Sequence, residues 1–296
     1  MATQSTSNFN AASLNRNPFS PRTLLGLIMS GIAGLFTLMA IIPLLIILTY
    51  LLTKGISSLS AAVFIELPPP PLVEGGGFGN AILGTVIMVG IGALISVPMG
   101  IMAAIYLSEF NEGKVAEWIR FATNVLSGVP SIIVGVFAYS AIVLTTKSYS
   151  AWAGGFALAI LMLPIIVRTT DEALKLVPQD VRQASVGIGA SNYQTVLQVV
   201  LPAALPAIIT GVTLSVARAA GETAPLLFTA LFTQYWPNWG NRLVEPTASL
   251  AVLVYNFAIV PFKNQQDLAW GAAFILVLLV LLTSIISRLA TAKRTY

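Results

Sequence analysis

The sequence predicts an all-α membrane protein with six transmembrane helices, and its composition and apolar segments both support this fold class. Of the 296 residues, 56% are hydrophobic and only 9% are charged, and the mean hydropathy is +0.86. A soluble domain usually carries about 25% charged residues. The apolar residues also fall into long runs, and a helix of about 20 such residues crosses the hydrocarbon core of a bilayer. The chain is therefore expected to cross a membrane several times.

Six apolar segments are candidates for these spans, and polar or charged loops separate them. They are expected at about Leu24–Leu52, Asn80–Leu107, Phe121–Leu144, Gly154–Val167, Ala207–Phe232 and Gln266–Arg288. The fourth segment is short and contains Pro164, so its helix is expected to continue past Arg168. The corresponding domains are a disordered cytoplasmic tail (1–20), the first helix with an outer loop (21–79), the main transmembrane domain (80–290) and a second cytoplasmic tail (291–296).

The lysines and arginines predict how the chain is oriented. With the N-terminus inside the cell, the inner segments hold ten of the 15 basic residues and the outer segments hold four. Cytoplasmic loops usually carry the excess of basic residues. This bias predicts that both termini are cytoplasmic, which requires an even number of spans.

The residue types exclude most catalytic sites. The chain has no cysteine and no histidine, so it lacks thiolate ligands and the commonest catalytic base. A phosphate-binding loop needs the pattern G-x-x-x-x-G-K-[ST], but the Gly113-Lys114 pair is followed by Val115. We therefore expect no catalytic residue, no metal and no cofactor bound by this chain.

A charged pair lies in the fifth apolar segment. Arg218 lies eleven residues beyond Ala207, which is about 16 Å along a helix and hence near the middle of the bilayer. Glu222 is four residues further on and would share its helix face. Arg before Glu is the less favourable order along a helix. The pair is interpreted as a site for a polar, anionic solute, and the alternative is an ion pair that orients two helices.

Three other segments carry weaker signals. Leu126-Ser-Gly-Val-Pro-Ser131 is expected to break or kink the third span, either as part of a solute path or as a simple kink. The outer segment 53–79 contains four prolines and three glycines in two runs, and it either contacts a soluble partner or only connects two spans. In the outer segment 233–265, Ser249–Val260 is expected to form a half-buried or surface helix, and the aromatic residues an interfacial belt.

The long inner loop, 168–206, contains a spaced motif. It reads Gln183-Ala-Ser-Val-Gly-Ile-Gly189 and, nine residues after Gly189, Val199-Val-Leu-Pro202. This pattern resembles the EAA motif of the permease subunits of ABC importers, although Gln183 replaces the Glu and Ser185 replaces the second Ala. The resemblance implies the MetI-like fold of type I ABC-importer permeases. It also implies a short coupling helix that docks on a separate ATPase subunit through Gln183, Ala184, Ser185, Gly187 and Gly189.

Three further stretches narrow the resemblance. They are Leu126–Gly135, Arg168–Pro178 and Arg218–Ala230, and they resemble the phosphate-specific ABC permeases of the PstA type over nearly all of residues 75–290. This resemblance implies a cell inner membrane location, a PstC-type permease partner, a PstB-type ATPase dimer that hydrolyses ATP with Mg, and a PstS-type phosphate-binding protein. Related alternatives are a PstC-type permease, a sulfate or molybdate permease and, in another class, a secondary anion carrier.

If phosphate is the solute, the chemistry of individual residues suggests their roles. Arg218 is expected to bind phosphate oxygens and Glu222 to accept the phosphate proton. Arg168 is either a second cation on the exit route or an anchor at the lipid headgroups. Thr223 either donates its hydroxyl to phosphate or bonds back to its own helix.

Overall fold

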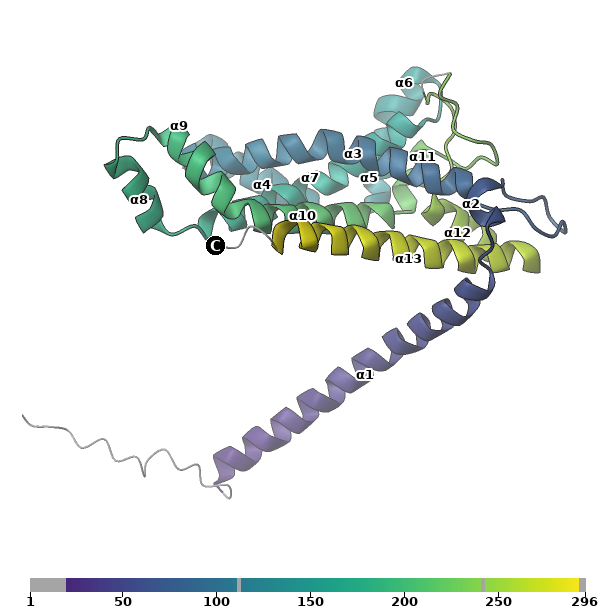
Figure 1. Ribbon diagram of the computed structural model, residues 1–296, viewed down its shortest axis with the longest axis horizontal. Coiled ribbons are helices and arrows are strands. Elements are labelled where there is room, and N and C mark those ends of the chain that lie inside the picture. Colours follow the sequence, from purple (N-terminus) through teal and green to yellow (C-terminus); the bar gives the residue numbers. More distant parts are fainter. Residues whose placement is uncertain (1–19, 111–112, 241–242, 293–296) are drawn as a thin grey trace, which may run out of the picture. The chain divides into compact units, whose positions relative to one another are not determined.

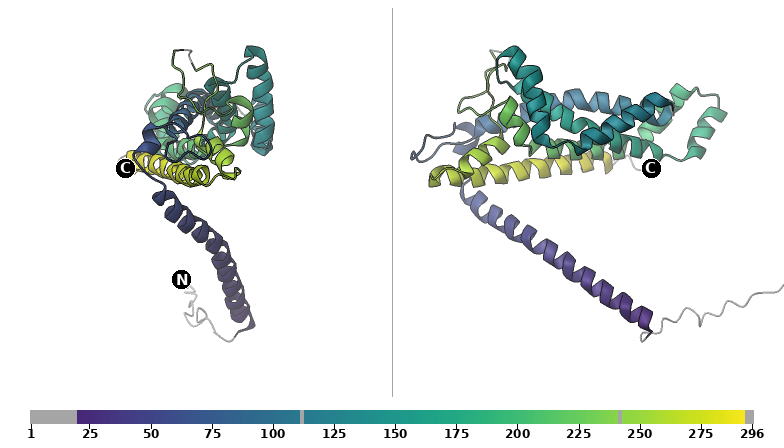
Figure 2. Two further views of the ribbon diagram at one scale, coloured as in Figure 1. Left: turned by 90° about the vertical axis from the view of Figure 1, so that its right-hand side faces the viewer. Right: turned by 180° about the vertical axis from the view of Figure 1, so that it is seen from behind.

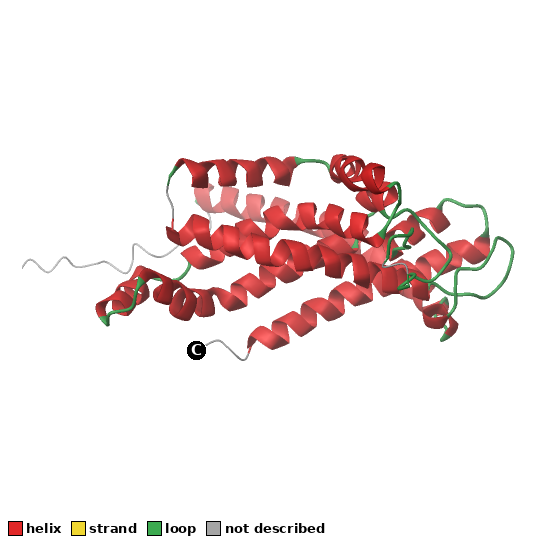
Figure 3. Cartoon of the chain, turned by 90° about the horizontal axis from the view of Figure 1, so that it is seen from above, coloured by secondary structure: helices red, strands yellow, loops and turns green. Residues whose placement is uncertain are grey.

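The computed structural model describes residues 20–110, 113–240 and 243–292, and it divides the chain into two compact units, Met1–Leu52 and Thr53–Tyr296. Helix α1 (Pro21–Ser57) makes up nearly all of the described part of the first unit and ends inside the second. The described residues form helices and loops without any strand (Figure 3). All of the predicted N-terminal tail except residue 20, and the last four residues of the chain, lie outside the described residues.

The second unit consists of helices, with three π-helical turns at Tyr106–Phe110, Tyr139–Val143 and Val196–Val200. The α-helices after α1 are α2 (Ala62–Ile65), α3 (Gly79–Ile105), α4 (Lys114–Gly128), α5 (Ser131–Ala138), α6 (Leu144–Thr146), α7 (Ala151–Lys175), α8 (Gln179–Gly187), α9 (Asn192–Thr195), α10 (Leu201–Ala220), α11 (Ala224–Thr229), α12 (Leu250–Ala258) and α13 (Lys263–Ala292).

Five helical segments of the described chain are long and apolar enough to cross a membrane, and a sixth results if one bent pair counts as one span. The bent pair is Lys114–Gly128 with Ser131–Thr146, and the direction of the chain bends by 106° between the two helices. The break falls at Val129-Pro130, inside the stretch for which the sequence predicts a break, because proline removes a backbone donor and fixes its own φ. Six spans are therefore confirmed if the broken span is counted as one.

The fourth span is longer than its apolar run. α7 begins at Ala151 because the Ser150 side chain accepts a hydrogen bond from the Ala153 amide, which caps the helix. It continues past Arg168 to Lys175, as the sequence predicts, and ends before Val177-Pro178.

The predicted fifth span, Ala207–Phe232, is wrong at both ends. The spanning helix runs from Asn192 to Ala220, because Ser191 and Gln194 form a capping box at its start. A π-helical turn precedes Pro202, so the helix continues through this proline instead of starting there. Gly221 ends α10, and the chain then turns into the separate short helix α11. The inner loop outside the spanning helices thus shrinks to residues 176–191.

Helix α7 lies at the centre of the second unit, where α3 and α10 pack along it (Figures 1 and 2). α3 approaches closely through glycine, since a Cβ at Gly100 would lie 2.7 Å from Cγ2 of Ile166. α8 and α9 lie at one end of these helices, and α2 lies at the other end (Figure 1). We call the end with α8 the inner end and the opposite end the outer end.

Both outer segments pack onto the helices. α12 is half-buried, as the sequence predicts. Leu250, Leu253 and Phe257 join Phe78 in one core cluster, whereas Tyr255 is 48% exposed. In the segment 53–79, the Gln265 side chain donates to the carbonyl of Pro69 at 3.1 Å. The proline run is thereby fixed against the first turn of α13.

Candidate functional site

Arg218 lies in the last turn of α10, at about half the height of α7. A Cβ at Gly211 would lie 2.2 Å from Oγ1 of Thr169, so these two positions of α10 and α7 are level. Seven residues separate Gly211 from Arg218, which is about 10 Å of helix. α7 runs antiparallel to α10, so Arg218 is level with the residue seven positions before Thr169. This residue is Met162, close to the midpoint of Ala151–Lys175. The guanidinium is therefore attached halfway between the two ends of the helices.

The Arg218–Glu222 pair forms, but its helical setting differs from the prediction. Nε of Arg218 lies 3.5 Å from Oε1 of Glu222. The two residues do not share a helix face, because α10 ends at Ala220 and Glu222 lies in the turn that follows. A cation in the last turn is favoured by the helix dipole, so the argument that the pair opposes the dipole is wrong.

The two members of this pair differ in exposure. The Arg218 side chain is 59% exposed and that of Glu222 is 14% exposed in the single chain. Among the described residues, the Arg218 side chain has no partner beyond this contact with Glu222. Two terminal nitrogens of a guanidinium fork therefore remain available to an oxyanion, which they can bind in a bidentate manner.

Thr223 stands next to Glu222, at the position that caps α11. Its side chain makes no capping hydrogen bond, and it has no other hydrogen-bond partner among the described residues. The partly buried hydroxyl therefore does not bond back to the helix in this conformation, and it remains free to donate.

The structure brings the broken third span next to this pair. A Cβ at Gly135 would lie 2.7 Å from Cα of Pro225, so α5 packs directly on the backbone of α11. Gly135 ends the stretch Leu126–Gly135, and Pro225 belongs to the stretch Arg218–Ala230. Two motifs that lie far apart in the sequence thus meet where the chain leaves Glu222.

Arg168 lies apart from the pair, toward the inner end of α7. Its Nε donates to Oε1 of Glu172 at 3.1 Å, and both side chains are mainly exposed, at 67% and 63%. It lines a cavity of about 280 Å³ between α4 and α7, together with Arg120 and Asp171.

The predicted coupling residues lie on or just after α8. Gln183, Ala184, Gly187 and Gly189 are exposed, whereas Ser185 is buried. Oγ of Ser185 lies 3.0 Å from Oγ1 of Thr195, so this side chain holds α8 to α9 rather than facing outward. Gly189 has a φ of +93°, a conformation that favours glycine, and it forms the turn after the helix.

Sequence reasoning missed a group of ion pairs at the inner end. Arg182 of α8 pairs with Glu109 in the π-helical turn after α3. Asp171 of α7 pairs with Lys175 at 2.5 Å and lies 3.9 Å from Arg120 of α4. The available signals were Asp171 and Lys175, which lie four residues apart in a predicted helix, and Glu109, an acidic residue just after a long apolar run.

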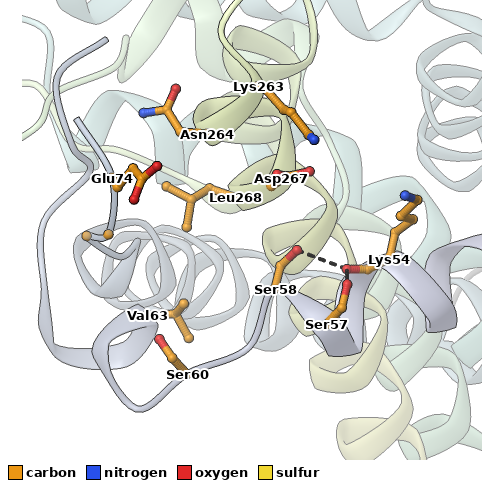
Figure 4. Close-up of a pocket in the computed structure, with 12 residues that line it drawn as sticks. Lys54, Ser57, Ser58, Ser60, Val63, Glu74, Lys263, Asn264, Asp267 and Leu268 are labelled. Atoms are coloured by element: carbon orange, nitrogen blue, oxygen red, sulfur yellow. Dashed lines mark hydrogen bonds between the residues drawn. The ribbon is translucent and has the colours of Figure 1, made fainter. Parts of the chain in front are cut away.

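A polar cavity of about 600 Å³ lies at the outer end, beside the end of α1 and the start of α13 (Figure 4). Two lysines, Lys54 and Lys263, and two carboxylates, Glu74 and Asp267, line it. None of the predicted site residues lines this cavity. Among the described residues, no group of three or more His, Cys, Asp or Glu is placed to hold a metal ion.

Comparison with known proteins identifies the family. Residues 96–294 match the model of the binding-protein-dependent transport system inner membrane component. The chain is 43% identical to the phosphate transport system permease protein PstA of Haemophilus influenzae, over 88% of this chain and 92% of that protein. It is 41% identical to the PstA protein of Yersinia pestis, over 82% of each chain. A probable PstA protein of Methanocaldococcus jannaschii is 31% identical, over 84% of this chain and 88% of that one.

Solved structures show the same fold. An inward-facing MetNI methionine ABC transporter matches with a TM-score of 0.60 at 20% identity, over 73% of this chain and 95% of that chain. A bacterial alginate ABC transporter matches with a TM-score of 0.64 at 13% identity, over 92% and 96%. The fold is the MetI-like fold that the sequence predicts. With most of its length matched by the family model and by these relatives, the chain belongs to the inner-membrane components of binding-protein-dependent transport systems.

Proposed function

We propose that this chain is the PstA-type permease subunit of an ATP-driven importer of inorganic phosphate. The relatives that carry the PstA name cover most of both chains, which supports the substrate class. The observation that carries the proposal is the Arg218–Glu222 pair at mid-height of the helices. The guanidinium has unused hydrogen-bond donors, and the carboxylate beside it is mostly buried.

The chemistry of the pair suits a protonated oxyanion. Phosphate near neutral pH carries negative charge and at least one proton. Arg218 donates two parallel hydrogen bonds to the phosphate oxygens, and Glu222 accepts the phosphate proton. Sulfate lacks this proton and leaves the carboxylate unpaired, which costs about 1–3 kcal/mol or more. The pair therefore binds phosphate and discriminates against sulfate.

Two further residues complete the proposed route. The hydroxyl of Thr223, which has no other partner in the described part of the chain, adds a donor next to Glu222. Arg168 lies about 9 Å nearer the inner end than the level of Arg218, since six residues of α7 separate it from Met162. It serves as a second cation for the departing anion.

The chain forms half of the path for phosphate across the membrane. Other subunits complete the path, hydrolyse ATP and deliver phosphate from outside. We infer a PstC-type permease that forms the other half of the path, a PstB-type ATPase dimer and a PstS-type binding protein outside. ATP, hydrolysed with Mg on the ATPase, moves α8, and the spans around Arg218 re-orient between the two faces of the membrane. The basic inner loops favour cytoplasmic termini and an ATPase on the α8 side.

Phosphate uptake into proteoliposomes tests the proposal. The complex is purified with its partner subunits and reconstituted, and ATP-dependent uptake of labelled phosphate is measured for the native chain and for Arg218→Gln. Two charge-assisted hydrogen bonds are worth about 3 kcal/mol or more, so uptake should fall at least about a hundredfold. Arg22→Gln, which removes the same charge in the first turn of α1, is the matched control and should transport normally.

Subunit composition and competition complete this test. Arg218→Gln should still co-purify with the ATPase, because the pair does not hold the helices together. Excess sulfate should leave uptake by the native complex unchanged, and competition by sulfate would favour a sulfate permease. Normal uptake by Arg218→Gln would remove the pair from the mechanism. Arg168→Ala separates the two roles of that residue, since a lipid anchor predicts unchanged uptake and a second cation predicts a loss.

A further inference from the structure

Arg182 and Glu109 form a buried ion pair between the coupling segment and the transmembrane helices. An NH group of Arg182 donates to the Glu109 carboxylate, and the side chains are only 15% and 7% exposed. The two residues lie 73 positions apart in the sequence. The pair is therefore a tertiary contact, unlike the local pairs on α7.

The Arg182 guanidinium contacts a second helix as well. Its other terminal nitrogen donates at 2.8 Å to the carbonyl of Leu174, in the last turn of α7. The Glu109 carboxylate also accepts from the hydroxyl of Ser108 at 3.1 Å. One side chain of α8 is thus fixed to the inner ends of both α3 and α7.

These inner ends are themselves tied to the broken span. Arg120 of α4 donates to the carbonyl of Leu107 at 2.9 Å, just before Glu109, and lies 3.9 Å from Asp171 of α7. α4 continues through the break into α5, which packs on Pro225. A series of direct contacts therefore runs from α8 to the turn that holds Glu222.

Other positions of α8 are exposed, and two of these exposed side chains are large and apolar. Val181 and Val186 on the helix and Ile188 after it are exposed to 40%, 51% and 89%. Opposite Arg182 and Ser185, the helix exposes Gln183, Ala184 and Gly187. This side is open to another protein, while Arg182 and Ser185 hold the inward side to the rest of the chain. If another protein displaces α8, the contacts on the inward side of α8 decide how much of that displacement reaches the other helices.

We propose that the Arg182–Glu109 pair is the joint through which movement of α8 is transferred to the inner ends of α3 and α7. Both are positioning residues, because neither touches the solute path. The proposal rests on the proposed function, in which α8 docks on the ATPase. A buried guanidinium with two partners holds a fixed orientation, whereas without Glu109 the helix is free to tilt when it is pushed.

Uptake per ATP hydrolysed tests the joint. Glu109→Gln removes the charge with little change of shape, and it should keep assembly and ATP hydrolysis while uptake per ATP falls by about fivefold or more, as for a lost coupling of 1 kcal/mol. Glu117→Gln, an exposed carboxylate in the first turn of α4, is the matched control. If α8 of Glu109→Gln fails to fold, the double variant Glu109→Leu/Arg182→Met replaces the pair by apolar side chains, which proteins often tolerate. An unchanged ratio in the double variant overturns the proposal.

A distance measurement tests the joint independently of the solute. The chain has no cysteine, so Asp180→Cys on α8 and Met102→Cys on α3 give one unique pair of spin labels. Electron–electron resonance should show the same distance with and without a non-hydrolysable ATP analogue, because both elements move together. Adding Glu109→Gln should broaden or shift the distance with the analogue.

These two readouts separate the two proposals. A native complex that hydrolyses ATP without transporting phosphate overturns the substrate assignment, while the distances still report on the joint. Identical distances in both chains, with and without the analogue, overturn the joint and leave the substrate assignment standing.

Discussion

Two Arg–Glu pairs in this chain have the same chemistry but differ in burial and in how far apart their members lie in the sequence. Arg218–Glu222 is local, 3.5 Å apart and open on the arginine side, with 59% of that side chain exposed. Arg182–Glu109 joins distant segments, and its arginine is 15% exposed and bonded to a carbonyl as well. A guanidinium with free donors can exchange its partner for a solute, whereas one whose neighbours enclose it cannot. Burial and the number of partners, rather than residue type, separate the proposed binding site from the proposed structural tie.

The largest expected difference between the two pairs is in local stability. Glu109→Ala leaves a buried guanidinium without its counter-ion, which costs about 3 kcal/mol or more. Hydrogen exchange of residues 179–190 in the purified complex should then be about a hundredfold faster. Glu222→Ala removes the partner of an exposed arginine and should leave exchange in this segment unchanged. Equal exchange in all three chains would show that the buried pair does not hold α8.

A smaller effect is expected from separating α5 and α11. Gly135→Val places methyl groups against the backbone of Pro225, where even a Cβ lies 2.7 Å away. Such overpacking costs about 2 kcal/mol, measured as the free energy of unfolding in sodium dodecyl sulfate. Gly128→Val, in the same broken span but with no neighbour within 4 Å, is the control. A loss of phosphate uptake in Gly135→Val alone would show that the open pair depends on this contact.

The selectivity of the open pair should change by about tenfold. Glu222→Gln offers an amide to the anion, so the cost of an unpaired carboxylate beside sulfate, about 1.4 kcal/mol, disappears. The ratio of phosphate to sulfate uptake, measured in proteoliposomes, should therefore fall by this factor while subunit assembly is unchanged. A ratio equal to that of the native chain would assign discrimination to other groups.

The smallest effect is expected for a third pair, which is exposed on both sides. Arg168 and Glu172 are 67% and 63% exposed, and exposed pairs four residues apart on a helix contribute about 0.3–0.5 kcal/mol. A double-mutant cycle with Arg168→Ala and Glu172→Ala, measured by unfolding, should give a coupling energy in this range. A value several times larger would indicate that neighbouring subunits bury the pair in the complex.

A further test concerns the docking face of α8. A bulky residue at Gly189 would be a poor test. Gly189 has a φ of +93°, so Gly189→Trp would strain the backbone as well as add bulk, and the two effects could not be separated. Gly187→Trp avoids this problem, since Gly187 is helical and has no neighbour within 4 Å. If the ATPase docks here, this variant should lose ATP-driven uptake while the isolated chain remains folded, as monitored by circular dichroism. Normal uptake would place the docking point elsewhere.

The sequence predicts the number of spans well, because long apolar runs and proline breaks are local signals. It places the fifth span wrongly, since Ser191 and Gln194 begin the helix in a polar segment and Gly221 ends it inside an apolar one. Hydropathy cannot detect either event. The Arg218–Glu222 pair was visible because its members lie four residues apart, but the Arg182–Glu109 pair requires a fold that brings distant segments together. The sequence likewise predicts that Ser185 is a docking residue, whereas in the structure its contact with Thr195 shows that it faces inward.

The end of α10 at Ala220 has one more consequence. The last carbonyl groups of a helix carry about half a negative charge, and Arg218 itself accepts from the Gly221 amide through its carbonyl. An anion that reaches this guanidinium therefore meets a field already weakened by the peptide dipoles and by Glu222. If the pair binds phosphate as proposed, we expect a short residence, which favours rapid turnover over tight capture. Under the proposed function, high affinity for phosphate is then expected in the binding protein outside, and this membrane subunit is expected to release the anion readily.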